Sequence, residues 1–410
     1  MSSIKKKAST TDYHLDVLIG KDRLPLEAQH IREFYIVLDI DKFLPSVRMK
    51  LMDTSKVLSN IVPFDTDGST LTVRLSNDSV PENATEFIFK LYRKFPNSND
   101  IYDVAGLLDV PKLFSPSNVK GYSGSVRDTL ESIAINDLKL DETDISPSLS
   151  LSKDLLQPSI STGEFLTGLK SSLVGNLDTS GYFCYIQCNG KKKKFVFKSI
   201  AEFYSAKIKY SFINTFDPSY DSTSGKTKFP ILEYKAYDNY KILGISGTRQ
   251  VDYSYFDTVT GKYIYKSLKV QNNTDPLDDY FSLTPYFSIN IDDSTDNINI
   301  PHAGRNTDYA LDCKGCAKNI LHKKINNLSK FWLTSLGLED IYPGDIVTVQ
   351  FLDVPSALTS HQYNGFWMVE RVVHLIGRQF NTRLLLTRNG VNTSEASSLM
   401  PVNTSNIKIK

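Results

Sequence analysis

The feature that most constrains the fold of this chain is a series of short runs in which apolar and polar residues alternate. VRMKLMD (47–53), LTVRL (71–75) and EFIFKLYRKF (86–95) follow this pattern, and Gly, Pro, Asn and Asp separate the runs. A period of two residues is typical of strands with one buried face, and the flanking breakers mark turns. Several such strands at this spacing predict a small β-barrel or sandwich over residues 1–100.

A second group of strands is expected near the other end of the chain, over residues 331–392. DGSTLTVRL followed by EFIFKLYRKF is weakly echoed there by PGDIVTVQF followed by GFWMVERVVHL. Each copy has a turn with Gly, an alternating strand, and then a longer strand rich in aromatic residues. We therefore predict two similar barrels in one chain. The Ser- and Asn-rich residues 393–410 are expected to form a tail that stays mobile until it meets a partner.

Between the two groups, residues 101–235 are predicted to form an α/β module. Val126, Leu130, Ile133, Ala134 and Leu138 recur at helical spacing, which predicts a helix over 124–140. A polar stretch, 141–160, is interpreted as a loop. Ser161 and Glu164 have the spacing of a capping box, and this predicts a second helix over 164–175.

Asn189-Gly190 lies between two β runs and predicts a hairpin with a type I′ turn, because that turn needs positive φ at both central residues. Lys191 to Lys194 follow on the second strand. They can be a solvated face of the hairpin or a charged contact with a partner, and the sequence leaves both alternatives open. Residues 236–330 are predicted to form a further module, with a hairpin around Gly261, irregular structure over 271–300 and a helix over 316–331.

Charge and composition exclude several classes of protein. The 47 basic and 46 acidic residues give a net charge of +1, which argues against a dedicated nucleic-acid binder. The 22 Tyr and 22 Phe favour strands. The basic cluster at the N-terminus is not followed by the apolar stretch of a secretory signal, and no run approaches the roughly 18 apolar residues of a membrane helix. We expect synthesis in a cytoplasm and no membrane span.

The strongest metal-like spacing is Cys313-Lys-Gly-Cys316, with His322 as a further candidate ligand. One such pair supplies two ligands, whereas structural zinc takes four. The other two cysteines, Cys184 and Cys188, alternate on one strand face, which predicts burial in a core. Structural or free cysteines are the favoured interpretation, with zinc binding and a redox role as alternatives. We predict no metal and no cofactor, and retain Cys313, Cys316 and His322 as weak candidates.

No catalytic constellation stands out. SGKT at 224–227 lacks the glycine and the following helix that a phosphate loop needs. The six histidines are scattered, and His374 is interpreted as a barrel residue rather than a catalyst. The acidic group at 292–296 lacks the glycine and glutamate of a calcium loop. The sequence therefore predicts a protein that is not an enzyme, with no catalytic residues.

The order of these elements resembles the baseplate hub proteins of contractile-tailed phages. QPSISTGEFLTGLKSSLVGNLDTSGYFCYIQCNGKKKKFVFKSI (157–200) resembles their central module. The segment after Pro343-Gly344-Asp345, with Gly365–His374 and a last strand from Thr382, resembles their final barrel. FYIVLDIDKFLPSVRMKLMD (34–53) resembles their first barrel. The resemblance covers most of residues 10–390, and the family includes the hub part of type VI secretion spike proteins and the phage late control protein D group.

The resemblance implies a β-rich α+β fold, in which two tail-tube-like β-barrel domains have α/β modules inserted between them. It further implies a homotrimer whose six barrels mimic a hexameric tail tube. Such a ring joins the tube to a trimeric central spike, contacts other baseplate proteins, and surrounds a channel that DNA crosses without specific binding. The expected location is the virion tail, with a part in host entry.

Two other functions stay open at this stage. Exposed Tyr and Phe can stack on sugars, which would suit a tail-associated protein that binds carbohydrate or a receptor. A cell-wall-degrading tail enzyme is the less favoured alternative, because a glycosidase needs two placed carboxylates and nothing in the sequence selects them.

Overall fold

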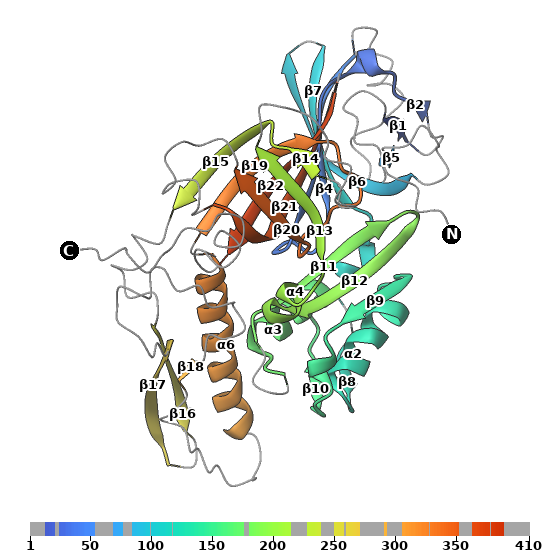
Figure 1. Cartoon of the computed structure of the whole chain (residues 1–410). Helices are drawn as coiled ribbons and strands as arrows, with labels where there is room; N and C mark the ends of the chain where they lie inside the picture. The colour runs from blue at the N-terminus through green and yellow to red at the C-terminus, as the bar shows by residue number, and fades with distance from the viewer. Residues whose placement is uncertain are drawn as a thin grey trace, which may run out of the picture. The chain divides into compact units, whose positions relative to one another are not determined.

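The structure is a computed structural model of the 410-residue chain (Figure 1). It describes residues 13–20, 24–53, 69–76, 84–98, 100–116, 118–175, 180–214, 228–238, 250–257, 260–270, 291–292, 306–327, 329–351, 363–377 and 379–388. The phosphate-loop-like segment, most of 271–300 and the C-terminal tail lie outside these residues, so the predictions made for them are not addressed by the structure.

The chain divides into two compact units. The first contains residues 1–202, 334–344 and 370–385, and the second contains 203–333, 345–369 and 386–410. Both units therefore take residues from the C-terminal part of the chain. Two strands, β21 (Gly365–Ile376) and β22 (Phe380–Arg388), begin in one unit and end in the other.

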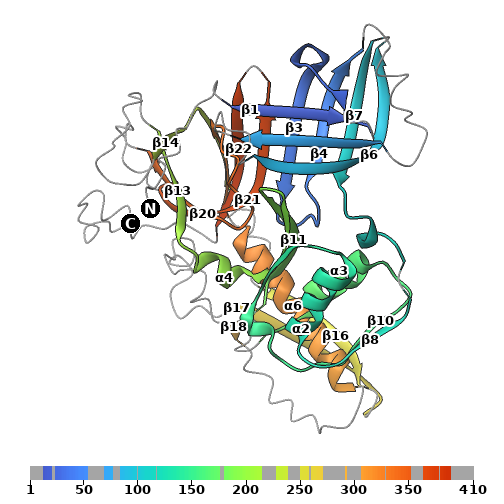
Figure 2. The same ribbon diagram turned by 90° about the vertical axis from the view of Figure 1, so that its right-hand side faces the viewer.

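The first unit holds a row of strands in the order β3-β4-β7-β6-β5-β1-β2. Figure 2 shows β1 and β6 running across β3 and β4, as in a strongly curved sheet. The strands are β1 (His14–Ile19), β2 (Leu24–Pro25), β3 (Ile31–Asp39), β4 (Ser46–Met52), β5 (Thr70–Ser76), β6 (Thr85–Ser98) and β7 (Ile101–Leu108).

The alternation found in the sequence is the alternation between core and surface in these strands. Val47, Met49 and Leu51 of β4 are buried, as are Leu71 and Val73 of β5. The long strand β6 pairs with β5 through residues 85–90 and continues along β7 through residue 98. One strand thus belongs to two pairings in succession, which lets the sheet curve around a single apolar interior.

No strand pairing among the described residues closes this row into a complete ring. Contacts of Tyr13 instead join the β1 side of this row to the β21–β22 turn. Tyr13, next to β1, donates a hydrogen bond from its hydroxyl to the carbonyl of Gly377 and packs against the ring of Phe380 at 5.7 Å. Gly377 and Phe380 lie at the β21–β22 turn, so the first strand returns to the last hairpin through these contacts.

The second set of strands has the order β15-β19-β22-β21-β20-β13-β14. Only Ile231 and Leu232 separate β14 from β15, so a two-residue corner connects the two ends of this row along the chain. The remaining strands are β13 (Ile208–Asn214), β14 (Lys228–Pro230), β15 (Glu233–Asp238), β19 (Ser329–Leu336) and β20 (Ile346–Phe351).

In both rows the strands are arranged in space in the same way relative to their order along the chain. The strands that correspond are β3 and β15, β4 and β19, β7 and β22, β6 and β21, β5 and β20, and β1 and β13. One difference is direction: β1 is antiparallel to β5, whereas β13 is parallel to β20. The weak echo in the sequence corresponds to β5–β6 and β20–β21, which are both antiparallel pairs with a longer second strand.

The segment between the rows contains short helices packed with a small sheet (Figure 1). The sheet has the order β11-β12-β9, and a separate pair joins β8 to β10. The elements are β8 (Lys120–Tyr122), α2 (Val126–Ser132), β9 (Glu142–Ile145), β10 (Leu155–Gln157), α3 (Thr162–Ser172), β11 (Tyr182–Asn189), β12 (Lys192–Ser199) and α4 (Ile200–Tyr204).

The predicted capping box is confirmed. The Ser161 hydroxyl accepts a hydrogen bond from the Glu164 amide at 3.2 Å, and the Glu164 carboxylate accepts one from the Ser161 amide at 2.9 Å. The helix predicted over 124–140 is α2 followed by a wider π turn over Ile133–Asp137. The prediction of a loop over 141–160 was wrong, because this segment contains β9 and β10. β9 is polar except for Ile145, and β10 has only three residues, so neither gives an alternating apolar run.

The predicted hairpin is confirmed, but its turn differs by one residue. Asn189 pairs with Lys192, so Gly190 and Lys191 are the two central residues. Gly190 has a φ of 58°, and Asn189 and Lys191 do not have positive φ. This pattern is typical of a type II′ turn, in which only the first central residue needs positive φ, rather than of the predicted type I′ turn.

The insertion between β15 and β19 contains β16 (Gln250–Asp257), β17 (Lys262–Val270), β18 (Ile291–Asp292) and α6 (Asn306–Asn326). The hairpin around Gly261 is confirmed. The helix predicted over 316–331 begins earlier and ends earlier, because Ser329 starts strand β19. In total, a β-rich α+β fold is confirmed, with few helices.

Candidate functional site

The weak metal candidates all lie on α6 and do not converge. Cys313 and Cys316 are three residues apart, on neighbouring positions of the helix surface. His322 is nine residues beyond Cys313, which at about 100° per residue places it on the opposite side of the helix. Among the residues that the structure describes, no group of three or more His, Cys, Asp and Glu side chains could hold a metal ion.

The other two cysteines are core residues, as the alternation predicted. Cys184 and Cys188 on β11 are both free and buried. Burial raises the pKa of the Cys188 thiol to about 12, and the nearby Lys193 lowers it only in part. A thiol with so high a pKa is poorly nucleophilic at neutral pH. These side chains therefore serve packing rather than chemistry.

His374 lies on β21 with its side chain in the interior, and no strand pairing among the described residues closes a barrel around it. Its side chain is buried, its ring packs against Phe380 at 5.6 Å, and its Nδ1 lies 3.5 Å from the Thr382 hydroxyl oxygen. Burial lowers the pKa of His374 to about 4, although Asp340 acts in the opposite direction. The ring is therefore neutral at pH 7.

The lysines of the β11–β12 hairpin form intramolecular ion pairs. Lys192 pairs with Glu142 at 2.7 Å, and Asp144 receives Lys194 at 3.0 Å and Lys198 at 2.7 Å. Burial opposes ionisation of Asp144, but hydrogen bonds from the two lysines outweigh it and lower the pKa of Asp144. Both acids come from β9, which lies parallel to β12.

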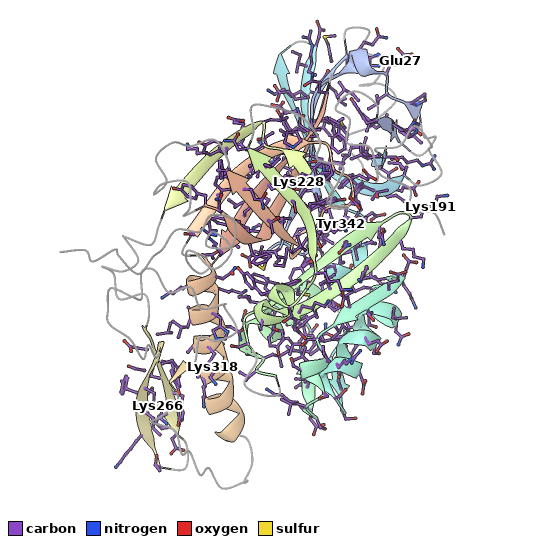
Figure 3. All side chains as sticks on the ribbon, in the orientation of Figure 1. Glu27, Lys191, Lys228, Lys266, Lys318 and Tyr342 are labelled. Atoms are coloured by element: carbon purple, nitrogen blue, oxygen red, sulfur yellow. The ribbon has the colours of Figure 1, made fainter. Side chains whose placement is uncertain are left out.

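The hairpin tip is itself attached to the first strand row. The carbonyl of Gly190 accepts a hydrogen bond from the amide of Glu86, the second residue of β6, at 2.9 Å. Lys191, at the tip in Figure 3, is exposed. Both alternatives from the sequence, a solvated face and a charged contact with a partner, stay open, because intramolecular pairing of exposed or partly exposed lysines excludes neither of them.

The edge of strand β3 is covered by strand β21 of the same chain. The C-terminal half of β21, residues 371–376, pairs antiparallel with residues 34–39 of β3. One further hydrogen bond, from the Ile40 amide to the Glu370 carbonyl at 3.0 Å, extends this ladder. Arg371 lies opposite Asp39, and its Nε and Nη2 contact the Asp39 Oδ2 at 2.7 and 2.6 Å.

The sequence patterns did not find this Arg–Asp pair, because the two residues are 332 positions apart and neither belongs to a motif. One signal was present. Tyr35 and Asp39 of β3 have the same spacing as Tyr234 and Asp238 of β15, and each Asp is the last residue of its strand. A search for repeated spacing, rather than for repeated identity, would have marked both strands.

An exposed aromatic face lies on the β16–β17 hairpin. Phe256, Tyr263 and Tyr265 are exposed, and the Phe256 and Tyr263 rings meet edge to face at 5.1 Å. Phe256 pairs across the strands with Tyr263, and Ser254 pairs with Tyr265. These side chains therefore belong to one side of the hairpin.

Comparison with known proteins identifies the fold. No protein-family model matches the sequence, and no curated protein matches it. Among solved structures, the chain is similar to the 43 kDa tail protein of prophage MuSo2 from Shewanella oneidensis, with a TM-score of 0.55 and 8% identity, covering 92% of this chain and 99% of that one.

Two further structures are similar. The tail protein from Neisseria meningitidis MC58 has a TM-score of 0.53 and 14% identity, with 94% of this chain and 99% of that chain covered. A chain of the lidded Francisella PdpA-VgrG complex has a TM-score of 0.51 and 12% identity, with 93% and 53% covered. Among the described residues, no helix has both the length and the apolar character that a membrane crossing requires. The chain has the fold of these two tail proteins and of the matching chain in the PdpA-VgrG complex.

Proposed function

We propose that this chain is a structural protein of a virion tail, in which it forms the baseplate hub ring. The observation that supports this most directly is the repeated strand order, since one chain carries two sets of strands with the same permutation. The fold shared with tail proteins supports the same role.

The repeat gives a physical reason for the role. A ring of three chains with two equivalent strand sets each presents six similar surfaces to a hexameric tail tube, and three identical chains to a trimeric spike. Closed rotational symmetry is the usual architecture of homo-oligomers. In this proposal the ring contacts the tail tube, the central spike and other baseplate proteins, and the chain is not an enzyme.

DNA would cross the channel of such a ring without specific binding. The net charge of +1 suits passage, because a strongly basic wall would retain the phosphate backbone. The location in this proposal is the virion tail, after synthesis in the host cytoplasm.

Light scattering of the purified full-length chain tests the ring. We expect a mass about three times 46.2 kDa at micromolar concentration. Reconstruction of tail particles that contain the chain then tests its position between tube and spike. A chain that stays monomeric up to high concentration and is missing from assembled tails would contradict the proposal.

The exposed aromatic face on β16–β17 favours a second candidate, a tail-associated protein that binds carbohydrate or a receptor. Aromatic rings on an exposed sheet surface offer apolar faces on which a partner can stack. Binding of the full-length chain to a glycan array, lost in Tyr265→Ala together with Tyr263→Ala, would support it. Absence of binding by the native chain would leave the hub as the better account.

A further inference from the structure

The two cysteines of helix α6 lie together on one side of the helix. Cys313 and Cys316 are partly exposed, and neither is in a disulfide. At about 100° per residue they are about 60° apart around the helix, in a stripe that continues to Ile320 and Lys324. Ile320 is 47% exposed and Lys324 is exposed, whereas Leu321, outside the stripe, is fully buried. Both thiols therefore lie on the side of α6 that is exposed in the described part of the chain.

The first of these cysteines also lies next to strand β16, which packs against α6 (Figure 1). Burial and Asp257 raise the pKa of Tyr255 on this strand, and an ionised Cys313 raises it further. An electrostatic effect of this kind requires the phenol and the thiol to lie close to each other. A change in the covalent state of Cys313 would therefore act where the β16–β17 hairpin rests on the helix.

The helix backbone brings the two cysteines close to the geometry of a disulfide. Cα atoms three residues apart in a helix are separated by about 5 Å, within the range of about 4.4–6.8 Å that disulfides use. The Cβ atoms of such a pair are about 5–6 Å apart, whereas a disulfide needs about 3.5–4.5 Å. The turn between the cysteines must therefore tighten by roughly 1 Å before the sulfur atoms can bond.

Gly315, between the two cysteines, allows this tightening. It lies in the interior of the helix, where glycine holds the helical conformation less firmly than any residue except proline. Its carbonyl accepts a hydrogen bond from Nδ2 of the buried Asn319 at 2.8 Å. Because this donor belongs to a side chain, it can follow the carbonyl when the turn distorts, and the buried acceptor keeps a partner. The helix is thus deformable at the turn that joins the two thiols.

We propose that Cys313 and Cys316 are a reversible oxidation site, which closes to a disulfide within α6 when the protein meets a low-molecular-weight disulfide. The thiolate of one cysteine attacks the small disulfide, forms a mixed disulfide and releases one small thiol. The thiolate of the other cysteine then attacks the sulfur of the first and releases the second small thiol. The two cysteines lose two electrons and two protons, and the small disulfide is reduced to two thiols. This inference goes beyond the proposed hub and does not depend on it.

Thiol counting in the full-length chain tests the site. The reduced protein is equilibrated with mixtures of reduced and oxidised glutathione at neutral pH, unfolded in urea, alkylated and analysed by mass spectrometry. We expect Cys313 and Cys316 to escape alkylation after oxidation, and peptide mapping to show a disulfide between them. The buried Cys184 and Cys188 serve as the internal control, because both should stay reduced and be alkylated in urea.

Substitutions in the full-length chain separate the steps. Cys316→Ser should stop the reaction at the mixed disulfide, so that the chain retains a single glutathione, and Cys313→Ser should do the same. Gly315→Ala stiffens the turn and should lower the equilibrium constant for oxidation about fourfold to fivefold. Gly168→Ala is the matched control, since this glycine is exposed on helix α3 and an added Cβ meets no atom within 4 Å. It should leave the equilibrium constant unchanged.

The expected result is an internal disulfide in the native chain that neither single-cysteine variant forms. Four alkylated thiols after equilibration with oxidised glutathione would overturn the inference. Disulfides between chains would also overturn it, as would a zinc ion that the pair retains and that blocks oxidation. If Gly315→Ala fails to fold, the two cysteine variants still decide. None of these results depends on ring formation, so thiol counting and light scattering test the two proposals separately.

Discussion

Strand β3 and strand β15 hold the same place in two rows of the same strand order, but among the described strands β3 pairs on both sides, with β4 and β21, whereas β15 pairs with β19. β3 is covered by β21, and its terminal Asp39 is 8% exposed and paired with Arg371. Near the start of β15, Leu232 and Tyr234 are 52% and 49% exposed, and the Tyr234 ring packs against that of Phe351 at 4.9 Å. The comparison teaches that two rows with the same strand order can differ in how the equivalent strand is flanked.

The largest expected effect tests whether the two rows bury equivalent side chains. Phe89 of β6 and Trp367 of β21 hold corresponding positions, and both are fully buried. Truncation of either to alanine should lower the free energy of unfolding by about 3–5 kcal/mol. Urea denaturation of the two variants checks this. A loss below about 1 kcal/mol for one of them would contradict the conclusion that positions 89 and 367 are equivalent.

The next effect depends on pH and concerns the buried His374 of β21. The pKa of His374 is lowered to about 4 in the folded state, from an ordinary value near 6.5. The stabilisation is thus present above pH 6.5 and is lost as pH falls towards 4, by up to about 3 kcal/mol.

Urea denaturation at pH 7 and pH 4.5 measures this effect. We expect His374→Gln to remove much of the pH dependence, because glutamine does not titrate. The same pH dependence in both proteins would show that other groups cause it.

A smaller effect tests the covered edge directly. Asp39→Asn keeps the size of the side chain but removes the charge that faces Arg371. Because Arg371 is 37% exposed, we expect a loss of only about 1–2 kcal/mol in unfolding free energy. Thermal unfolding measures it, and Asp41→Asn, a nearby exposed carboxylate, is the control. An equal loss of stability in both variants would mean that the Arg371–Asp39 pair does not stabilise the pairing of β3 with β21.

The smallest expected effect concerns helix α3, which belongs to neither row of strands. Ser161→Ala removes one half of the capping box of α3 and should cost about 1 kcal/mol. Ser161→Asp should recover most of it, because aspartate is also a good N-cap residue. Failure of aspartate to recover stability would show that the serine acts through another contact.

The sequence predicted most of the strands and the helix α3, because alternation and caps are local signals. It did not predict β9 and β10, because strands of four and three residues are too short to show an alternating pattern. It misplaced α6, since the alternating run that begins at Ser329 also fits a helical spacing. The Arg371–Asp39 pair could not be predicted, because its partners are distant in the chain and only the sheet order brings them together.

If the chain is part of a virion tail, as proposed above, the burial of Cys184 and Cys188 has a consequence for its passage from a reducing cytoplasm to the outside of the cell. The two residues are four positions apart on one strand, about 13 Å, which is too far for a disulfide between them. With the Cys188 pKa raised to about 12, little thiolate is present to react with oxidants. The core of the β11–β12 sheet would therefore keep the same covalent structure when the particle leaves its host.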